Sequence, residues 1–563
     1  MMDTESEYRS PSPLRNNSEE PSGARRGFLG SSTACLVGDF PSSARILGWK
    51  RHQLSNVWAR NLDRVNVLGN HRHGHTGCVN ALSWAQDGEL LISSGDDQDI
   101  RVWRIDPSTD SSEYPLSCQS VIHTGHTHNV FNAQMLPHST QIATVSGDKQ
   151  VRVFDVGEAV GRSPTGSEMT YTTNEACKRV LRCHTGRTKR IVTEDSPDLF
   201  LTVAEDGTVR QHDLRTSHVC GGHRCPPPLV KLPHDLSTIA LSPLTPYQFV
   251  VGGESPFAHL YDRRHIGRYL WEEWGMSPAT ADATTCVRKF SRHSRAPGEP
   301  KGGEHITGAR MSTWNGHEVR CAECCLSPAN QWLIPAFNSD AVYLYSTKDE
   351  PGNSERFKKL SVLAPNVKLR KRAGGLGVGT ESTVINIDDD SGDRDEREDL
   401  TIDAEEQDSV PVIYPRARFA GHCNVRTIKD VNFLGPYDEY VTSGSDDGNF
   451  FLWNKISGEL VDILEGDGSV VNVIEGHPTL PLAAVSGIDT TVKLFAPSRG
   501  RPEFSRLEQA TTIVKNNAHT SRRGLRSGDG MAIAHLLLRY RALTSLGSHE
   551  EEEDDDAVQC VNQ

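Results

Sequence analysis

Short runs of alternating apolar and polar residues recur along the chain, and each run is bounded by turn residues. The sharpest units start at Gly74, at Gly125 (ending at Asp155) and at Gly421 (ending at Trp453). Each contains a Gly-His pair, two strand-like runs, an Asp turn and a third run that ends near an aromatic residue. The apolar period is two and no connection inside a unit has a helical pattern, so each unit is predicted to be a small antiparallel sheet.

Four further units end at Arg215, Arg264, Tyr345 and Phe495, and the one that ends at Tyr345 is looser. A repeat of about 40 residues with Gly-His at one end and Trp-Asp at the other is typical of a WD40 blade. Seven units suit a closed ring, which leaves few exposed strand edges. The predicted fold class is therefore all-β, a seven-bladed WD40 β-propeller. Closure needs a strand from the other end of the chain, and Arg64–Leu68 is the best candidate for the outer strand of the last blade.

The polar residues of the repeat recur in the same order in three units. We interpret them as a structural network, because buried His and Asp side chains need hydrogen-bond partners and can satisfy each other. An active site normally occurs once in a chain, so a repeated triad indicates a scaffold and not an enzyme. Ser255 and Asp467 depart from the pattern, and their blades are expected to depend more on packing. The network residues are His75, Asp97, Trp103, His126, Asp148, His422, Asp447 and Trp453, with Phe154 at the second Trp position.

Two long intervals interrupt the repeats and set the expected organisation of the chain. His265–Trp314 is polar and rich in Pro and Gly, which indicates a loop with some strand at its start. Ser346–Pro415 is basic and then acidic, and is expected to be disordered. The expected organisation is a disordered N-terminus (1–42), a helical partner-docking segment (43–62), blades 1–5 (63–345), the insertion (346–415), blades 6 and 7 (416–497), and a C-terminal helix with an acidic tail (498–563).

Charged and apolar runs outside the blades suggest further roles. The basic run Lys368–Arg372 is consistent with a nuclear-import signal, a contact to an acidic surface or a solvated linker. Met531–Leu543 is predicted to be a short helix docked on the rim. Before the first blade, Ile46, Trp49, Leu54, Val57 and Trp58 fall near helical spacing. This segment either caps the ring or docks in a partner's groove, and its two Trp residues favour the partner.

The order of the blades, the acidic insertion, and the phrases GHTGCVN, EDGTVR, LYDRR and SGSDDGNFFLW carry a family resemblance. The chain resembles the DDB-and-cullin-associated factors, the WD40 substrate receptors of cullin-4 RING ubiquitin ligases, especially members with a split propeller such as the nuclear-receptor-interacting one. The resemblance covers roughly Ala44 to Pro497. It implies a non-enzymatic receptor that binds the DDB adaptor of the ligase.

The mark of that family is a W-D-x-R box on two successive blades, which binds the adaptor. The matching positions read His212-Asp213-Leu214-Arg215 and Tyr261-Asp262-Arg263-Arg264, so both arginines are present and His or Tyr replaces the Trp. The resemblance also implies that a helical segment before the propeller inserts into the adaptor, which fits Ser43–Leu62. The expected adaptor-binding residues are Arg215, Arg264, Asp213, Asp262, Trp49 and Trp58.

Composition narrows the remaining classes of function. No run of about 18 apolar residues occurs, which argues against a membrane span, and the first residues lack the apolar stretch of a secretory signal. The 13 cysteines are therefore expected to be reduced. The Cys220–Cys225 spacing, with His218, does not match a zinc finger, and Cys321, Cys324 and Cys325 are expected to be core thiols, so neither a metal nor a cofactor is predicted.

The net charge of −14 is concentrated in two segments. Glu381–Asp408 carries −11 and Glu550–Asp556 carries −7, so the remaining residues sum to about +4. Direct binding to nucleic acid is not predicted. The sequence favours a receptor in the nucleus or the cytoplasm; the alternative is a WD40 scaffold subunit of a nuclear chromatin, transcription or RNA-associated complex. The substrate cannot be deduced from the sequence.

Overall fold

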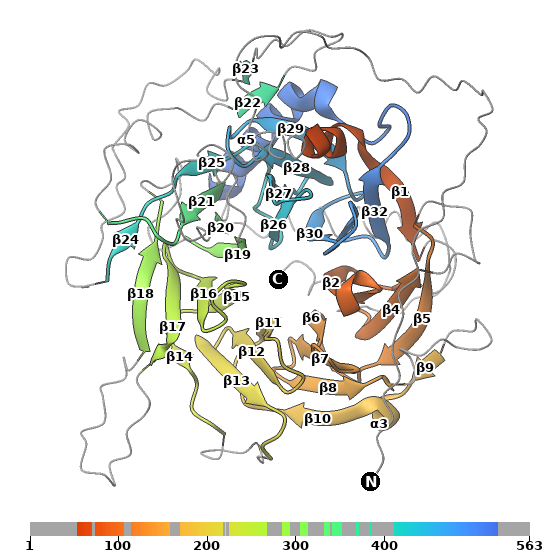
Figure 1. The fold of residues 1–563 in the computed structure, drawn as a ribbon, viewed down its shortest axis with the longest axis vertical. Coiled ribbons are helices and arrows are strands. Elements are labelled where there is room, and N and C mark those ends of the chain that lie inside the picture. The colour runs from red at the N-terminus through yellow and green to blue at the C-terminus, as the bar shows by residue number, and fades with distance from the viewer. Residues whose placement is uncertain are drawn as a thin grey trace, which may run out of the picture.

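In the computed structural model, strands account for most of the described chain and form seven hydrogen-bonded sheets around a ring (Figure 1). The predicted all-β propeller class is therefore confirmed. Within the described residues, no helix is both long enough and apolar enough to cross a membrane. The structure describes residues 53–69, 74–105, 114–157, 169–217, 220, 225–266, 284–292, 304–312, 332–337, 341–351, 367–370, 382–385 and 410–526.

Antiparallel hairpins connect most strands of the first three sheets, but the first sheet also gains a short parallel strand that follows the third strand of the second sheet in the chain. The first contains β2 (Val79–Ala85), β3 (Leu90–Gly95), β4 (Asp99–Ile105), β5 (Leu116–His123) and β9 (Met169–Tyr171). The second contains β6 (Val130–Met135), β7 (Gln141–Ser146), β8 (Val151–Asp155) and β10 (Cys177–Leu181). The third contains β11 (Thr188–Thr193), β12 (Leu199–Ala204), β13 (Thr208–Asp213) and β14 (Val230–Lys231). The short elements η1 (Gln86–Gly88) and α3 (Thr173–Ala176) lie between strands.

The other sheets include strands from more distant parts of the chain. The fourth contains β15 (Leu236–Leu241), β16 (Gln248–Gly253), β17 (Ala258–Ile266), β18 (Thr284–Phe290) and β24 (Val412–Ile413). The fifth contains β19 (Ile306–Ser312), β20 (Trp332–Phe337), β21 (Val342–Ser346) and β25 (Ala417–Phe419). The sixth contains β26 (Val431–Leu434), β27 (Tyr440–Gly444), β28 (Asn449–Asn454), β29 (Leu460–Glu465), β22 (Val367–Arg370) and β23 (Ser382–Ile385).

The ring closes through a strand from the start of the chain, as the sequence predicted. The last sheet contains β30 (Val471–Gly476), β31 (Ala483–Gly487), β32 (Val492–Pro497) and β1 (Leu62–Leu68). β1 is antiparallel to β32, with Leu62 opposite Pro497 and Leu68 opposite Val492. Figure 1 shows these two strands side by side although they come from opposite ends of the chain. Pairing both ends in one sheet removes two exposed edges, so the closing strand stabilises the whole ring.

The core lies between neighbouring sheets. One cluster combines Leu82 and Leu91 of the first sheet with Val473 and Leu494 of the last sheet, and all four side chains are buried. Apolar residues on both faces of the inner strands make these contacts. Each sheet is therefore stabilised by two neighbours, as expected for a repeat that cannot bury its own apolar surface.

The region predicted as the insertion His265–Trp314 contains two strands of the ring. β19 is the first strand of the fifth sheet and pairs with β20. β18 belongs to the fourth sheet, where it pairs with β17. The loop prediction was therefore wrong for Ile306–Ser312, because Gly308 breaks the apolar alternation that identified the other strands.

The prediction that residues 346–415 are disordered throughout was also wrong. β22 and β23 form an antiparallel hairpin, and β22 adds to β29 in parallel; β24 adds to β18 in the same way. Val367 and Ile385 are buried in the core of the sixth sheet, which explains why this hairpin forms within a charged segment. Lys368, the first residue of the proposed import signal, is exposed on β22.

The structure describes a C-terminal helix that the sequence analysis did not predict. α5 (Ala510–Arg526) follows η4 (Leu507–Gln509), and Ala510 and Val514 are buried against the sixth sheet. The sequence pattern did not predict this helix, because its Lys, Asn, Arg and His residues outnumber its apolar residues. The predicted helix Met531–Leu543, Trp49, His218, the cluster of Cys321, Cys324 and Cys325, and residues 1–42 and 550–556 lie outside the described residues.

Candidate protein-interaction site

The two arginines of the predicted adaptor boxes have the same local geometry on adjacent sheets. Arg215, just beyond β13, donates from Nε and Nη2 to Asp213 at 2.9 and 2.8 Å. Arg264, on β17, donates from the same atoms to Asp262 at 3.0 and 2.7 Å. In both boxes the backbone N–H of the Arg also donates to the Asp at 3.0 Å. The Asp-x-Arg spacing therefore builds one repeated element, in which a carboxylate fixes a guanidinium.

Stacked aromatic rings support each box. His212 stacks on Phe200 with ring centroids 5.0 Å apart, and Tyr261 stacks on Phe249 at 5.6 Å. His212 Nε2 also lies 2.8 Å from Thr202 Oγ1. The corresponding contact in the first sheet joins Trp103 Nε1 to Ser93 Oγ at 2.9 Å. His and Tyr thus occupy the buried positions where the family pattern has Trp.

The box arginines remain accessible although their aspartates are held. The side chains of Arg215 and Arg264 are 62% and 58% exposed. The guanidinium of Arg264 also lies 3.6 Å from the centroid of the Tyr247 ring, a cation–π contact. The hydrogen bond from Arg264 lowers the pKa of Asp262 to about 2, and that from Arg215 lowers the pKa of Asp213. Both carboxylates are therefore ionised across the physiological pH range, and the orientation of the arginines does not depend on pH there.

Neighbouring residues fix the backbone around the boxes. Arg263 binds Glu194 at 2.7 Å and the carbonyl of Pro246 at 2.7 Å, which joins the fourth sheet to the third. Arg179 of β10 donates to the carbonyls of Leu214 and Thr216 on either side of Arg215. Two exposed guanidinium groups on a fixed frame can make bidentate bonds to carboxylates or carbonyls of a partner protein.

Trp58 is not an exposed docking residue. The helix formed by residues 53–61 buries Trp58, which is 4% exposed, stacks on Tyr440 at 5.7 Å and donates to the carbonyl of Pro481. Tyr440 in turn donates to the carbonyl of Ser55. The prediction that Trp58 contacts the adaptor is therefore wrong, because its indole is already buried against the propeller. Trp58 helps its helix to cap the ring of blades, which was the other interpretation of this segment.

The same helix presents two different apolar residues to solvent. Leu54 and Val57 are 57% and 54% exposed and lie three positions apart. Residues at that spacing share one face of a helix. Figure 1 places this helix beside β1 and β29, across the ring from β13 and β17. The structure therefore does not bring the helix and the arginine boxes together, and they form two separate candidate contact regions.

The predicted polar network is present in the first two sheets. His75 Nδ1 lies 2.9 Å from Asp97 Oδ2, and His75 Nε2 lies 2.8 Å from Ser93 Oγ. His126 has the same contacts with Asp148 and Thr144. Burial alone raises the pKa of Asp97, but the bond to His75 and the backbone N–H groups outweigh it and lower that pKa. Each network ties the loop before a sheet to its inner strands.

A third copy of this network was missed by the sequence analysis. His184 Nδ1 lies 3.1 Å from Asp206 Oδ2, and His184 Nε2 lies 2.8 Å from Thr202 Oγ1. The separation of His and Asp is 22 residues in all three sheets. That constant spacing was the available signal. It was overlooked because Cys183 replaces the Gly of Gly-His.

The sixth sheet has a different arrangement at the predicted positions. Trp453 Nε1 donates to the carbonyl of Ala420, and Asp447 accepts a bond of 2.9 Å from Asn517 of α5. The ring of His422 packs edge-on against Trp453. His422 precedes β26 by nine residues, whereas His75 precedes β2 by four. This longer loop accommodates additional polar residues at the centre of the ring.

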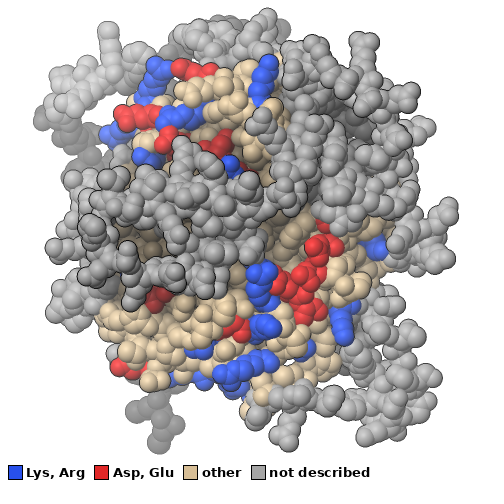
Figure 2. Space-filling view, turned by 180° about the vertical axis from the view of Figure 1, so that it is seen from behind, with Lys and Arg blue, Asp and Glu red and all other residues tan. Residues whose placement is uncertain are grey.

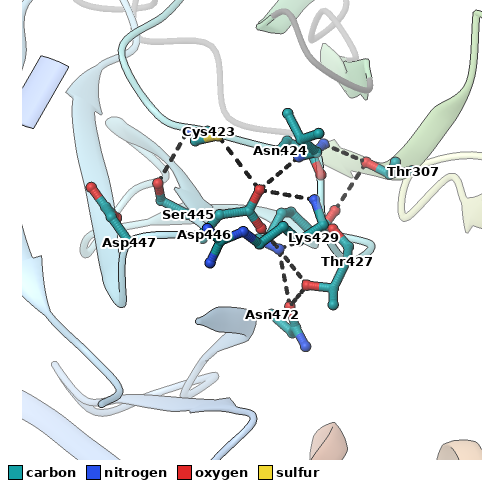
Figure 3. A network of polar contacts seen from close by, with 12 residues as sticks. Thr307, Cys423, Asn424, Thr427, Lys429, Ser445, Asp446, Asp447 and Asn472 are labelled. Carbon is teal, nitrogen blue, oxygen red and sulfur yellow. Dashed lines mark hydrogen bonds and ion pairs between the residues drawn. The ribbon is translucent and has the colours of Figure 1, made fainter. Parts of the chain in front are cut away.

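Those residues surround a buried ion pair (Figure 3). Lys429 Nζ lies 2.6 Å from Asp446 Oδ1, and the two side chains are 0% and 2% exposed. Lys429 also donates to the carbonyl of Thr427 at 2.9 Å and to Asn472 Oδ1 at 3.2 Å. Asp446 accepts the backbone N–H groups of Val425 and Arg426. Burial disfavours both charges, yet this pairing keeps the pKa of Asp446 below its usual value.

The last sheet also pairs a buried lysine with aspartates. Lys493 Nζ lies 3.1 Å from Asp467 and 2.9 Å from Asp489. Asp467 also accepts the backbone N–H of Asp489. The expectation that this blade depends more on packing than on a polar network missed these contacts, because Asp467, at the Gly-His position, forms a charged network in place of the His–Asp pair.

Charged side chains of both signs are interspersed on the described part of the face in Figure 2. Acidic and basic residues lie beside one another there and are separated by uncharged residues. A protein that binds nucleic acid through phosphates usually gathers basic residues on one face. The described part of this face therefore has no such stripe.

A comparison with family models finds the WD domain, G-beta repeat, at residues 66–104, 117–155 and 414–454. These segments include the first, second and sixth predicted units. The chain is therefore an all-β β-propeller that contains WD40 repeats.

Curated relatives extend this similarity. The WD repeat protein iqw1 of Schizosaccharomyces pombe is 34% identical over 54% of this chain and 35% of its own length. The human DDB1- and CUL4-associated factor 6 is 29% identical over 54% of this chain and 32% of its own. The chain thus spans about a third of each. The mouse WD and tetratricopeptide repeats protein 1 is 25% identical over 91% of this chain and 96% of its length.

Proposed function

We propose that this protein is a non-enzymatic substrate receptor, which recruits a protein target to a cullin-4 RING ubiquitin ligase through the DDB adaptor. The observation that carries the proposal is the repeated geometry of Arg215–Asp213 and Arg264–Asp262 on adjacent sheets. The similarity to the human DDB1- and CUL4-associated factor 6 supports it. The proposed receptor acts by proximity, because holding a target beside the ligase raises its effective concentration there.

The two arginines are suited to binding and not to catalysis. Each uses two N–H groups to hold its aspartate, and among the described contacts its remaining donors face no other acceptor. A fixed, exposed guanidinium loses little side-chain entropy on binding, which favours affinity. The exposed Leu54 and Val57 offer an additional apolar contact, in place of the buried Trp58.

A WD40 scaffold of a nuclear chromatin, transcription or RNA-associated complex is the alternative. Under that alternative, the exposed Lys368 of β22 and the acidic segments make the contacts, and the arginine boxes are solvated blade ends. The receptor hypothesis fits the repeated boxes better, because a solvated charge does not require the same Asp-x-Arg geometry twice. We propose residence in the nucleus, the cytoplasm or both.

Adaptor pull-down tests the receptor hypothesis. The double variant Arg215→Ala/Arg264→Ala should bind the adaptor at least about tenfold more weakly. Two interface arginines commonly contribute more than about 1.4 kcal/mol of binding free energy together. Arg501→Ala is the matched control, since Arg501 also forms an exposed ion pair, with Glu508, and is 77% exposed. Equal recovery by the double variant would exclude the boxes as the contact. Absence of the adaptor from wild-type complexes would exclude the receptor role itself.

A further inference from the structure

Three cysteine thiols from two different sheets converge at the rim beside the first arginine box. Cys183 follows β10 of the second sheet, and Cys220 and Cys225 lie in the connection between β13 and β14 of the third. The three Sγ atoms all lie within 4.8 Å of one another, and the Sγ atoms of Cys183 and Cys220 are 3.6 Å apart. Cys183 is buried, and the other two are half-buried.

We propose that Cys183, Cys220 and Cys225 bind a zinc ion. Zinc takes four tetrahedral ligands at about 2.3 Å from sulfur, which separates the sulfurs by about 3.8 Å. The Cys183–Cys220 separation is close to that value. Three thiolates supply three of the four ligands, and a solvent molecule or another donor supplies the fourth. Soft thiolates select zinc over magnesium or calcium, which bind oxygen ligands.

One backbone hydrogen-bond donor beside the three sulfurs suits a thiolate ligand. The backbone N–H of Arg182 donates to Cys220 Sγ at 3.2 Å. Such bonds stabilise negative charge on sulfur. Burial and the two neighbouring thiols raise the pKa of Cys183. A bound dication reverses that effect, because coordination deprotonates a thiol outright.

The proposed ion would fix the loop that begins at Arg215. Leu214, Cys220 and Cys225 all pack against the same core cluster as Cys183. Arg179 already binds the backbone on both sides of Arg215. A zinc ion would add a second link from this loop to the second sheet. The site would therefore keep the arginine box in place, although metal binding itself does not depend on the proposed ligase role.

The zinc content of the full-length protein tests the proposal. Protein purified from zinc-supplemented medium should contain about one equivalent of zinc, measured by mass spectrometry of the metal. Cys220→Ser should bind zinc at least about tenfold more weakly, because even residues that only orient ligands cost that much. Cys286→Ser is the control, since Cys286 is also half-buried but belongs to the fourth sheet. Circular dichroism should show that both variants remain folded.

Cobalt substitution and thiol alkylation give independent results. Co²⁺ bound to the wild type should show sulfur-to-metal charge-transfer absorption, which Cys220→Ser and Cys225→Ser should reduce. Zinc should protect the three thiols from alkylation until a chelator is added. Folded wild type that takes up neither metal would overturn the proposal. A Cys183–Cys220 disulfide that becomes alkylated only after reduction would overturn it as well and replace it with a redox link.

Discussion

The first three sheets and the last two use different chemistry to tie the entering loop to the inner strands. In the first three, a histidine is paired with an aspartate and a hydroxyl, as in His184, Asp206 and Thr202. In the last two, a buried lysine takes part, as Lys429 with Asp446 and Lys493 with Asp467. The fold is therefore compatible with either solution, provided that every buried polar group has a partner.

The two solutions differ in their electrostatic cost. A His–Asp pair can lie buried with only one full charge, because the imidazole can remain neutral; burial lowers the pKa of His126 and His184. A buried lysine and aspartate place two charges away from water, and their desolvation offsets much of their attraction. Removing one partner should thus be most damaging in the Lys429–Asp446 and Lys493–Asp467 pairs.

Lys429→Met should produce the largest loss of stability. The variant leaves Asp446 buried without its ammonium partner, which commonly costs about 3–5 kcal/mol in the free energy of unfolding. Chemical denaturation monitored by intrinsic fluorescence measures this loss. The double variant Lys429→Met/Asp446→Asn should recover at least half of it, because the amide can still accept from Val425 and Arg426. A double variant as unstable as the single one would show that packing, and not charge, controls this site.

His184→Ala should have a smaller effect, of about 1–3 kcal/mol, because Asp206 and Thr202 would lose a hydrogen-bond partner but a neutral imidazole forms no ion pair, and Asp206 would keep its bonds from Thr185 and Thr208. The matched control is His138→Ala. His138 lies 2.6 Å from Asp195, but the two side chains are 70% and 89% exposed, so the loss should be below about 1 kcal/mol. Equal losses in both variants, measured by the same denaturation, would contradict a structural role for the buried network.

Sequence patterns predicted the repeated features of this molecule and missed those made by distant segments. The strand Arg64–Leu68 was placed correctly in the last sheet, because its alternation and position leave one open edge to fill. The Asp-x-Arg boxes were also visible as a local motif. In contrast, β22 and β23 pair with the sixth sheet across a charged stretch, and β19 contains a glycine that weakens its pattern.

The side-chain environments were harder to predict than the strands. The burial of Trp58 depends on Tyr440 and Pro481, which lie hundreds of residues away in the sequence. The cysteine cluster depends on Cys183, which no local spacing connects with Cys220. The role of Lys493 was missed because Asp467 was interpreted alone. Tertiary contacts decided these environments, and a single sequence does not record them.

The pH dependence of stability gives the finest comparison of the two carboxylates that share Lys493. Burial raises the pKa of Asp467 to about 6, although Lys493 opposes this, whereas Lys493 and backbone N–H bonds outweigh burial and lower the pKa of Asp489. Between about pH 4 and 6 the folded state binds more protons at Asp467 than the unfolded state does, so its contribution to stability falls as pH rises. Asp489 contributes stability above about pH 4 that is lost on acidification.

On raising the pH from 4 to 7, Asp467→Asn should therefore gain roughly 1–2 kcal/mol in the free energy of unfolding relative to wild type. Asp489→Asn should lose stability relative to wild type as the pH rises toward about 4, because a lowered pKa acts below the pKa of the unfolded state. Unfolding free energies measured at several pH values would contradict this assignment if both differences changed in the same direction.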